Sequence, residues 1–213
     1  NASTDGTARI AKASGAAVLF ETRKGKGNAV RLGFSEVEAD YYVLVDGDGT
    51  YDVDACETML QTLIDNNHDM VVGVRKAVSC NSFPCGHKIC NRLFNLLFRL
   101  FFGNIFTDLF SGYRVFSHRF VKSFPAASDG FELETELSVH CVNLKASCSE
   151  VETQYFGRPA DSTSKLNTIS DGIAILIALL NMFRLNKPFY FYSIFSVLLV
   201  LLSIVFLIPI FID

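Results

Sequence analysis

The sequence predicts an α/β domain with a mostly parallel, Rossmann-like sheet, followed by one helix that spans a membrane. Two observations support this class. Short apolar runs alternate with helical patterns along residues 1–75, which is typical of a parallel sheet with both faces covered. Residues 189–212 then read FYFYSIFSVLLVLLSIVFLIPIFI without a charge. A bilayer core needs about 20 apolar residues in a helix, so this run is long enough to cross it.

The expected elements alternate between apolar runs of period two and helical patterns. Ser3, Thr4 and Asp5 can cap a first helix that ends near Ser14. We expect strands at 16–20, 41–45, 70–74, 113–116 and 151–156. We expect further helices from the RKGKGN loop at 23–28 to about Glu38, from Asp54 to about Asn66, at 88–103 and at 131–144.

The C-terminal run also indicates an orientation. Tyr190 and Tyr192 lie at its start, where aromatic residues meet the membrane surface, and Arg184 and Lys187 precede it. Positive residues favour the cytoplasmic side. We therefore expect a membrane protein whose catalytic domain lies on the cytoplasmic face. A buried core helix is the alternative, although such helices usually carry a polar face.

The segment KICNRLFNLLFRLFFG, residues 88–103, is expected to lie in the membrane interface. Arg92, Asn95 and Arg99 form one narrow polar stripe, and almost every other residue is Leu or Phe. The segment is too short to span a bilayer, and a basic stripe opposite a wide apolar face suits an interfacial helix. An ordinary core helix remains the alternative. A second apolar segment, 173–183, can also lie in the membrane interface.

The motif DGDGT follows the apolar run that ends at Val45, and it brings Asp46 and Asp48 to the end of a strand. A hairpin turn is one interpretation, but a helical pattern follows it rather than a second strand. A haloacid-dehalogenase-like phosphatase nucleophile is another, but that family's later acidic pair is not evident. The third is a metal clamp, because ligands of open α/β sheets bind beyond the carboxyl ends of strands. Two carboxylates there suit Mg²⁺ or Mn²⁺.

Seven stretches in order resemble the family 2, GT-A-type glycosyltransferases. The likeness is strongest to the branch of dolichyl-phosphate mannose and glucose synthases and bacterial polyprenyl-phosphate glycosyltransferases. The stretches are NASTDGT (1–7), GKGNAVRLGF (25–34), VDGDGTYD (45–52), VVGVR (71–75), DLFSGYRVF (108–116), GFELETEL (130–137) and YFGRPADSTSKL (155–166). The opening strand of that family is absent. We therefore expect a fragment cut at both ends, with at least one strand before Asn1.

The resemblance implies site residues for the donor and its metal. Asp5 and the loop of Gly25, Lys26 and Gly27 would lie on the nucleoside side of the donor. Asp46 and Asp48 would hold the metal and assist catalysis, and Thr50 stands where some relatives place a third ligand. Arg158 would face the donor diphosphate as a further catalytic residue.

Acceptor residues follow from the same resemblance. Arg75 and Lys88 would meet the acceptor phosphate, with Arg114 and Lys165 as the next candidates. Glu132 and Glu134 lie in an acidic motif two residues apart on a helix. Residues at that spacing do not share a helix face, so at most one of the two is expected to point into the site.

The implied organisation is a GT-A domain at 1–167, a juxtamembrane segment at 168–188 and a transmembrane helix at 189–212. The implied reaction moves a sugar from a nucleotide-diphosphate-sugar to a polyprenyl phosphate (dolichyl or undecaprenyl), with inversion and with Mg²⁺ or Mn²⁺. The expected partners are these two substrates and the lipid bilayer, and a homo-oligomer is compatible with the sequence. The net charge of −3 argues against nucleic-acid binding. A polysaccharide-type enzyme with a sugar-hydroxyl acceptor is the alternative, but its usual Trp-containing motif is missing because the chain has no Trp.

Overall fold

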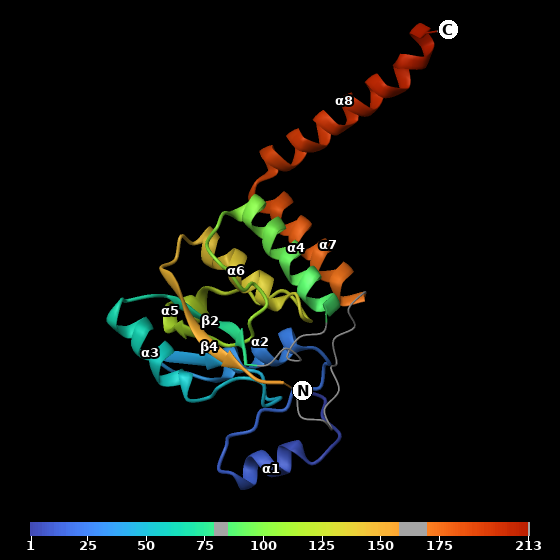
Figure 1. The fold of residues 1–213 in the computed structure, drawn as a ribbon. Helices are drawn as coiled ribbons and strands as arrows, with labels where there is room; N and C mark the ends of the chain where they lie inside the picture. The colour runs from blue at the N-terminus through green and yellow to red at the C-terminus, as the bar shows by residue number, and fades with distance from the viewer. Residues whose placement is uncertain (79–84, 158–169, 213) are drawn as a thin grey trace.

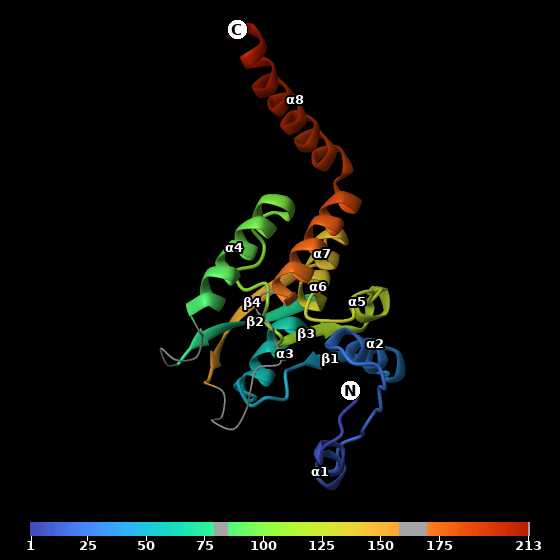
Figure 2. The same cartoon turned by 90° about the vertical axis from the view of Figure 1, so that its right-hand side faces the viewer.

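The computed structural model describes residues 1–78, 85–157 and 170–212, with side chains described for 1–78, 91–157 and 170–207. A twisted sheet lies at the centre, α3 lies on one side of it, and the helices α2, α4, α5, α6 and α7 lie on the other side (Figures 1 and 2). Helix α8 projects away from this body at the end of α7.

The sheet has four strands in the order β1-β3-β2-β4. They are β1 (Tyr41–Leu44), β2 (Met70–Ala77), β3 (Arg114–Ser117) and β4 (Cys148–Tyr155). Strands β1 and β2 each pair antiparallel with β3, whereas β2 pairs parallel with β4. Thus β1, β2 and β4 run in one direction and β3 alone runs against them. The mostly parallel sheet is therefore confirmed for strand direction, while β3 places an antiparallel strand in its middle.

The alternation of side chains along β2 and β3 divides the core into two layers. Met70, Val72 and Phe116 pack in a large cluster with residues of α2, α4, α6 and α7. Val71 and Val115 point to the opposite face of the sheet and pack in a second cluster. This cluster includes Met59 and Leu63 of α3 and three tyrosines, Tyr51, Tyr113 and Tyr155. Since successive strand residues face opposite sides of a sheet, the apolar run of β2 is covered on both faces. The buried part of β2 is therefore held by packing on each side, whereas Tyr41 and Val43 leave one face of β1 exposed.

The helices follow the expected periodicities closely. They are α1 (Thr7–Ala13), α2 (Lys26–Glu36), α3 (Ala55–Asp65), α4 (Cys85–Phe102), α5 (His118–Ser123), α6 (Leu133–Asn143), α7 (Ser170–Asn186) and α8 (Pro188–Ile212). The N-cap of α1 is Gly6 rather than one of the expected Ser3, Thr4 or Asp5. Asp5 precedes it, and its Oδ1 accepts hydrogen bonds from the backbone N and the hydroxyl of Thr7. Helix α5 was not expected, since six residues are too few to establish a helical period.

The strand expected at 16–20 is wrong. Residues 16–20 have no strand assignment, and Leu19 and Phe20 are exposed. A strand needs a neighbour that pairs with its backbone groups, and β1, at the edge of the sheet within the described residues, pairs only with β3. The apolar pattern alone therefore did not decide the structure of this segment.

Helix α4 divides its apolar residues between two surroundings. Phe94, Phe98 and Phe102 are buried in the large core cluster, where the neighbouring Phe101 stacks on Phe183 of α7 at 4.2 Å between ring centroids. A second row, Leu93, Leu96 and Leu100, is exposed, as are Arg92 and Arg99. Asn95 is not part of an outward polar stripe, because its Oδ1 accepts a hydrogen bond from the Leu109 N–H at 3.0 Å. The expected wide Phe/Leu membrane face is thus wrong for the phenylalanines, which are core residues.

Helix α8 stands apart from the folded body. Within the described residues, one helix is long and apolar enough to cross a membrane, at Pro188–Leu207, and no part of that window is buried. Its contact with the body runs through α7, where Phe183 meets Phe191 with their ring centroids 5.9 Å apart.

Candidate active site

The glycine loop before α2 packs closely on the chain that leads into α6. A Cβ at Gly25 would collide with the carbonyl oxygen of Asp129, and a Cβ at Gly27 would collide with that of Ser128. Gly25 also has φ of +125°, which only glycine adopts readily. The backbone N–H of Gly27 donates to the Asp129 carbonyl at 3.0 Å. This close approach brings Lys26, which lies between the two glycines, next to α6.

Lys26 lies between two carboxylates from different elements. Its Nζ is 2.6 Å from Oδ1 of Asp46, which follows β1, and it also forms an ion pair with Glu134 in the first turn of α6. The Lys26 side chain is 18% exposed and that of Glu134 is 5% exposed. Burial alone would lower the pKa of Lys26, but Glu134 and Asp46 outweigh burial and raise it. Lys26 therefore keeps its positive charge beside Asp46.

The acidic motif of α6 behaves as the sequence predicted. Glu134 points into the site, whereas Glu132 turns back to accept a hydrogen bond from the Gly130 N–H at 3.2 Å. One oxygen of Glu134 bonds Lys26, and the other, Oε2, is buried without a hydrogen-bond partner among the described residues. A buried carboxylate oxygen without a partner costs free energy, so Oε2 is a binding position that the fold leaves open.

Gly112, in the loop before β3, closes the other side of Asp46. A Cβ at Gly112 would lie 2.5 Å from Asp46 Oδ2 and 2.8 Å from Lys26 Nζ. The same residue donates its N–H to the Tyr51 hydroxyl at 2.9 Å. The loop lies in the stretch DLFSGYRVF (108–116), from which the sequence predicted no role for Gly112, and none was predicted for Tyr51. A glycine followed by Tyr and Arg carries no signal for a contact with an aspartate 66 positions earlier.

Asp48 is oriented by its own turn. Its Oδ1 accepts hydrogen bonds from the Thr50 backbone N at 3.2 Å and from the Thr50 hydroxyl at 2.6 Å. Thr50 is only 1% exposed. The expectation that Thr50 is a third metal ligand is therefore replaced by a positioning role, because its hydroxyl is buried and donates to Asp48.

Arg75 reaches the same region from the end of β2. Its Nε and Nη2 donate to the two oxygens of Asp108, each at 2.7 Å, and its guanidinium lies 5.5 Å from the Tyr155 ring centroid. Burial alone would lower the pKa of Arg75, but Asp108 outweighs burial and raises it. Tyr51 lies near both Asp46 and Arg75, and burial raises the pKa of Tyr51 to about 12. Arg75 is thus beside the site, held by a bidentate ion pair that the sequence did not predict.

Arg114 is not available to a phosphate. Its guanidinium is 0% exposed, and it donates to the carbonyls of Ser111 and Leu109 and to the Ser138 hydroxyl. Burial lowers its pKa. We therefore withdraw Arg114 from the acceptor residues, because its side chain belongs to the core and its hydrogen-bonding groups face backbone and a buried hydroxyl.

Three of the expected basic residues lie where their side chains are not described. Arg158 and Lys165 lie outside the described residues, and Lys88 belongs to the first turns of α4, for which only the backbone is described. Asp5, expected on the nucleoside side of the donor, lies at the start of α1 and bonds Thr7.

A divalent cation fits the carboxylates after β1 in chemistry and in access. Asp46 is 35% exposed, Asp48 is half-buried, and hard cations such as Mg²⁺ prefer oxygen ligands shared with a substrate phosphate. Among the described residues, no group of three or more His, Cys, Asp or Glu side chains is arranged to hold a metal. The protein would therefore supply two carboxylates, and a bound diphosphate would supply the other ligands.

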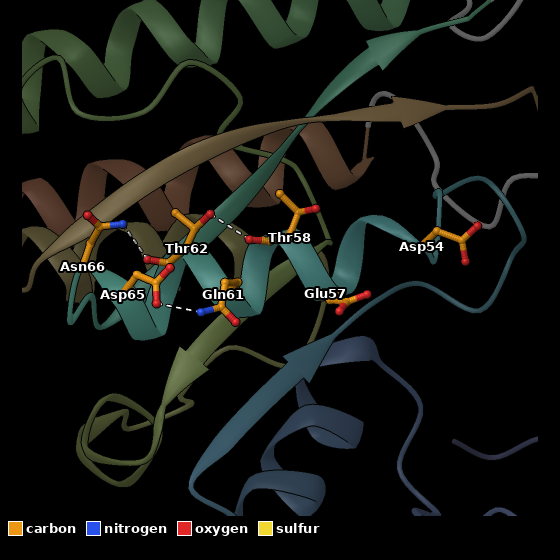
Figure 3. Close-up of a pocket in the computed structure, with 7 residues that line it drawn as sticks. All are labelled: Asp54, Glu57, Thr58, Gln61, Thr62, Asp65 and Asn66. Carbon is orange, nitrogen blue, oxygen red and sulfur yellow. Dashed lines mark hydrogen bonds between the residues drawn. The ribbon is translucent and has the colours of Figure 1, made fainter.

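Among the described residues, one hollow beside the sheet reaches the site, and another lies along α3. A hollow of about 480 Å³ lies between α2 and β1, and its wall includes Lys26, Asp46 and Gly47. The other, of about 450 Å³, lies along α3 from Asp54 to Asn66 (Figure 3). There Gln61 donates to Asp65 and Asn66 donates to the Thr62 carbonyl. These polar groups are paired within their own helix, so this second hollow offers no comparable set of catalytic groups.

The fold matches that of known nucleotide-sugar enzymes. The structure of glucosyl-3-phosphoglycerate synthase from Mycobacterium tuberculosis in complex with Mn²⁺, uridine-diphosphate-glucose and phosphoglyceric acid superposes with a TM-score of 0.63 and 18% identity. The match covers 85% of this chain and 65% of that one. The α/β domain is therefore of the GT-A type.

The sequence comparisons then give the family. The profile of glycosyl transferase family 2 matches residues 1–124. Glycosyltransferase AglJ of Haloferax volcanii is 36% identical over 90% of this chain and 63% of its own length. A low-salt glycan biosynthesis hexosyltransferase of the same organism is 28% identical over 91% of this chain and 46% of its own length. The chain belongs to glycosyl transferase family 2, and it spans less than two thirds of the length of these relatives. The phosphatase interpretation of the aspartate pair is thereby excluded.

Proposed function

We propose that this protein is a membrane-bound, inverting glycosyltransferase that moves a sugar from a nucleotide-diphosphate-sugar to a polyprenyl phosphate. The observation that carries the transfer chemistry is the pair Asp46 and Asp48 at the carboxyl end of β1, with Lys26 at 2.6 Å from Asp46. Both aspartates lie within the region that matches family 2. A structural neighbour binds Mn²⁺ and uridine-diphosphate-glucose on the same type of fold.

The chain's own groups would act mainly on the leaving diphosphate. Asp46 and Asp48 would hold Mg²⁺ or Mn²⁺, which supplies positive charge where the diphosphate develops negative charge. Lys26 adds a positive charge next to Asp46, and Arg158 is proposed to face the diphosphate. A phosphate-monoester acceptor is mostly a dianion at pH 7, since its second pKa is near 6. The acceptor therefore needs positioning more than deprotonation.

The acceptor is proposed to approach from the side of α4 and α7. Leu93, Leu96 and Leu100 are exposed on α4 beside Arg92 and Arg99, and α4 packs on the helix that continues into α8. Exposed apolar rows next to arginines suit the headgroup region of an anionic bilayer. Lys88 and Lys165 stay our proposed acceptor-phosphate residues. Arg75 stays a proposed acceptor-phosphate residue as well, with its Nε and Nη2 held by Asp108.

A donor and acceptor screen tests the reaction. The whole chain in detergent is incubated with UDP- and GDP-sugars, a polyprenyl phosphate and Mg²⁺ or Mn²⁺, with chelator in a parallel sample and Asp48→Asn as the inactive control. Glycolipid should form only with metal. A product on free sugar hydroxyls but not on the lipid phosphate would favour the polysaccharide-type alternative. No transfer to either acceptor, from any donor, would refute the proposal.

A fluorescence experiment tests the membrane face separately. The chain has no Trp, so a single Leu100→Trp substitution on α4 gives a unique signal. Brominated lipids in nanodiscs should quench it. The matched control is Ile64→Trp, an exposed position on α3 at the opposite face of the sheet, which should not be quenched. Equal quenching at both positions, or at neither, would contradict an interfacial α4.

A further inference from the structure

The Lys26 ammonium lies in direct contact with the carboxylate that is proposed to hold a divalent cation. Its Nζ is 2.6 Å from Asp46 Oδ1. A bound Mg²⁺ would lie about 2.1 Å from an Asp46 oxygen, so on the same oxygen the two cations would be at most about 4.7 Å apart. Gly112 packs against both Asp46 and Lys26. The ammonium would therefore be a positive charge close to the bound metal, and the two cations would share one carboxylate.

Glu134 offers the Lys26 ammonium a second hydrogen-bond acceptor. One Glu134 oxygen already bonds Lys26, and Oε2 is buried without a partner among the described residues. An unpaired buried carboxylate oxygen gains free energy when a donor reaches it. A small movement of Nζ from Asp46 toward Oε2 would satisfy that oxygen and leave Asp46 to the metal.

We propose that Lys26 occupies Asp46 as an internal cation in the absence of metal, and that Glu134 is a positioning residue that receives the Lys26 ammonium when a divalent metal binds. This inference rests on the metal site of the proposed function. Lys26 thereby weakens metal binding in the absence of nucleotide. A donor diphosphate offsets this effect by adding negative charge beside both cations, so that metal and donor bind cooperatively.

Direct Mn²⁺ binding tests this competition without measuring activity. Free Mn²⁺ is followed by electron paramagnetic resonance with the whole chain in detergent and without nucleotide. The informative variant is Lys26→Met with Glu134→Gln, because it removes the ammonium, keeps the net charge and leaves no buried charge unpaired. It should bind Mn²⁺ at least about fivefold tighter than the unchanged protein, as expected for loss of one competing ion pair.

A matched pair of substitutions controls for general effects. Lys24→Met with Glu132→Gln changes the same residue types in the same two segments, and Lys24 is exposed. This control should bind Mn²⁺ like the unchanged protein. Glu134→Gln alone should weaken Mn²⁺ binding, because Lys26 is then left with Asp46. If the double variant at Lys26 and Glu134 fails to fold, Glu134→Gln alone decides, because Mn²⁺ binding equal to that of the unchanged protein would overturn the proposal.

The outcomes separate this proposal from the proposed function. If Asp48→Asn loses Mn²⁺ while the double variant at Lys26 and Glu134 binds no tighter than the unchanged protein, the metal site stands and the competition is overturned. If Asp48→Asn binds Mn²⁺ as well as the unchanged protein, the metal lies elsewhere and both proposals fail. Tighter binding in the control pair would also overturn the role of Lys26.

Discussion

Gly112→Ala should disable the site while sparing the fold. The new methyl carbon would lie 2.5 Å from Asp46 Oδ2, whereas ordinary contacts of a Cβ begin at about 3.4 Å. Asp46 must therefore move by roughly 0.9 Å, the difference between these two distances. The three atoms met by the methyl group all belong to the side-chain ends of Asp46 and Lys26, so the backbone needs little change. A misplacement of about 1 Å at a reacting centre costs about 100-fold in rate.

The assay is sugar transfer at saturating metal, with thermal unfolding measured on the same samples. The matched control is Gly33→Ala in α2, where a Cβ would meet nothing within 4 Å. The control should keep full activity and gain about 1 kcal/mol of stability, because Ala favours a helix over Gly. Gly112→Ala could instead fold normally and keep more than about a tenth of wild-type kcat/KM, a loss under about 1.4 kcal/mol. That result would show that the reaction does not depend on the exact position of Asp46.

Three further predictions address the neighbouring groups. Asp48→Asn should abolish transfer with an unchanged Tm, since it removes a metal-held charge but keeps the shape; activity above about a tenth of wild type would contradict this. Asp108→Ala should lower the unfolding free energy by about 3–5 kcal/mol, because it removes the carboxylate that pairs with the buried Arg75. Adding Arg75→Met to this variant should recover part of the lost stability. An unchanged denaturation midpoint in Asp108→Ala would show that the ion pair does not stabilise the fold. Hydrogen bonds and charge from Arg23 lower the pKa of Glu21 from 4.5 to about 2, so this pair contributes stability above pH 4.5 that is lost as the pH falls toward 2. Glu21→Gln should reduce the loss of unfolding free energy between pH 4.5 and pH 2. If urea titrations show the same loss in Glu21→Gln and in the unchanged protein, this ion pair does not contribute to stability.

The sequence predicted most elements because their signals are local. The apolar run of β2 and the helical periods of α3 and α6 each lie within one window of the chain, so their existence followed from pattern alone. Strand order and the antiparallel placement of β3 did not follow. Alternation of side chains is the same in both directions, and pairing depends on residues far apart in sequence.

The site was predictable where a motif carries its own chemistry. Asp46 and Asp48 were singled out by their position at a strand end. Helix geometry predicted that at most one of Glu132 and Glu134 faces the site, but not which one. Contacts between distant segments were not evident. The burial of Arg114 and the ion pair of Arg75 with Asp108 depend on how loops cross in space, and an arginine in a motif looks the same in sequence whether it faces a ligand or the core.

The buried Arg114 has a consequence for how the candidate site responds to a ligand. Its guanidinium joins the backbone of Leu109 and Ser111, in the loop that carries Gly112, to Ser138 of α6, whose hydroxyl donates to the Glu134 carbonyl. The two walls of the site are therefore fixed to one another before any ligand arrives. Little conformational entropy remains to be lost there on binding, and preorganised dipoles need no rearrangement as charge develops. Closure of the site by movement of these two walls is therefore not expected when a ligand binds.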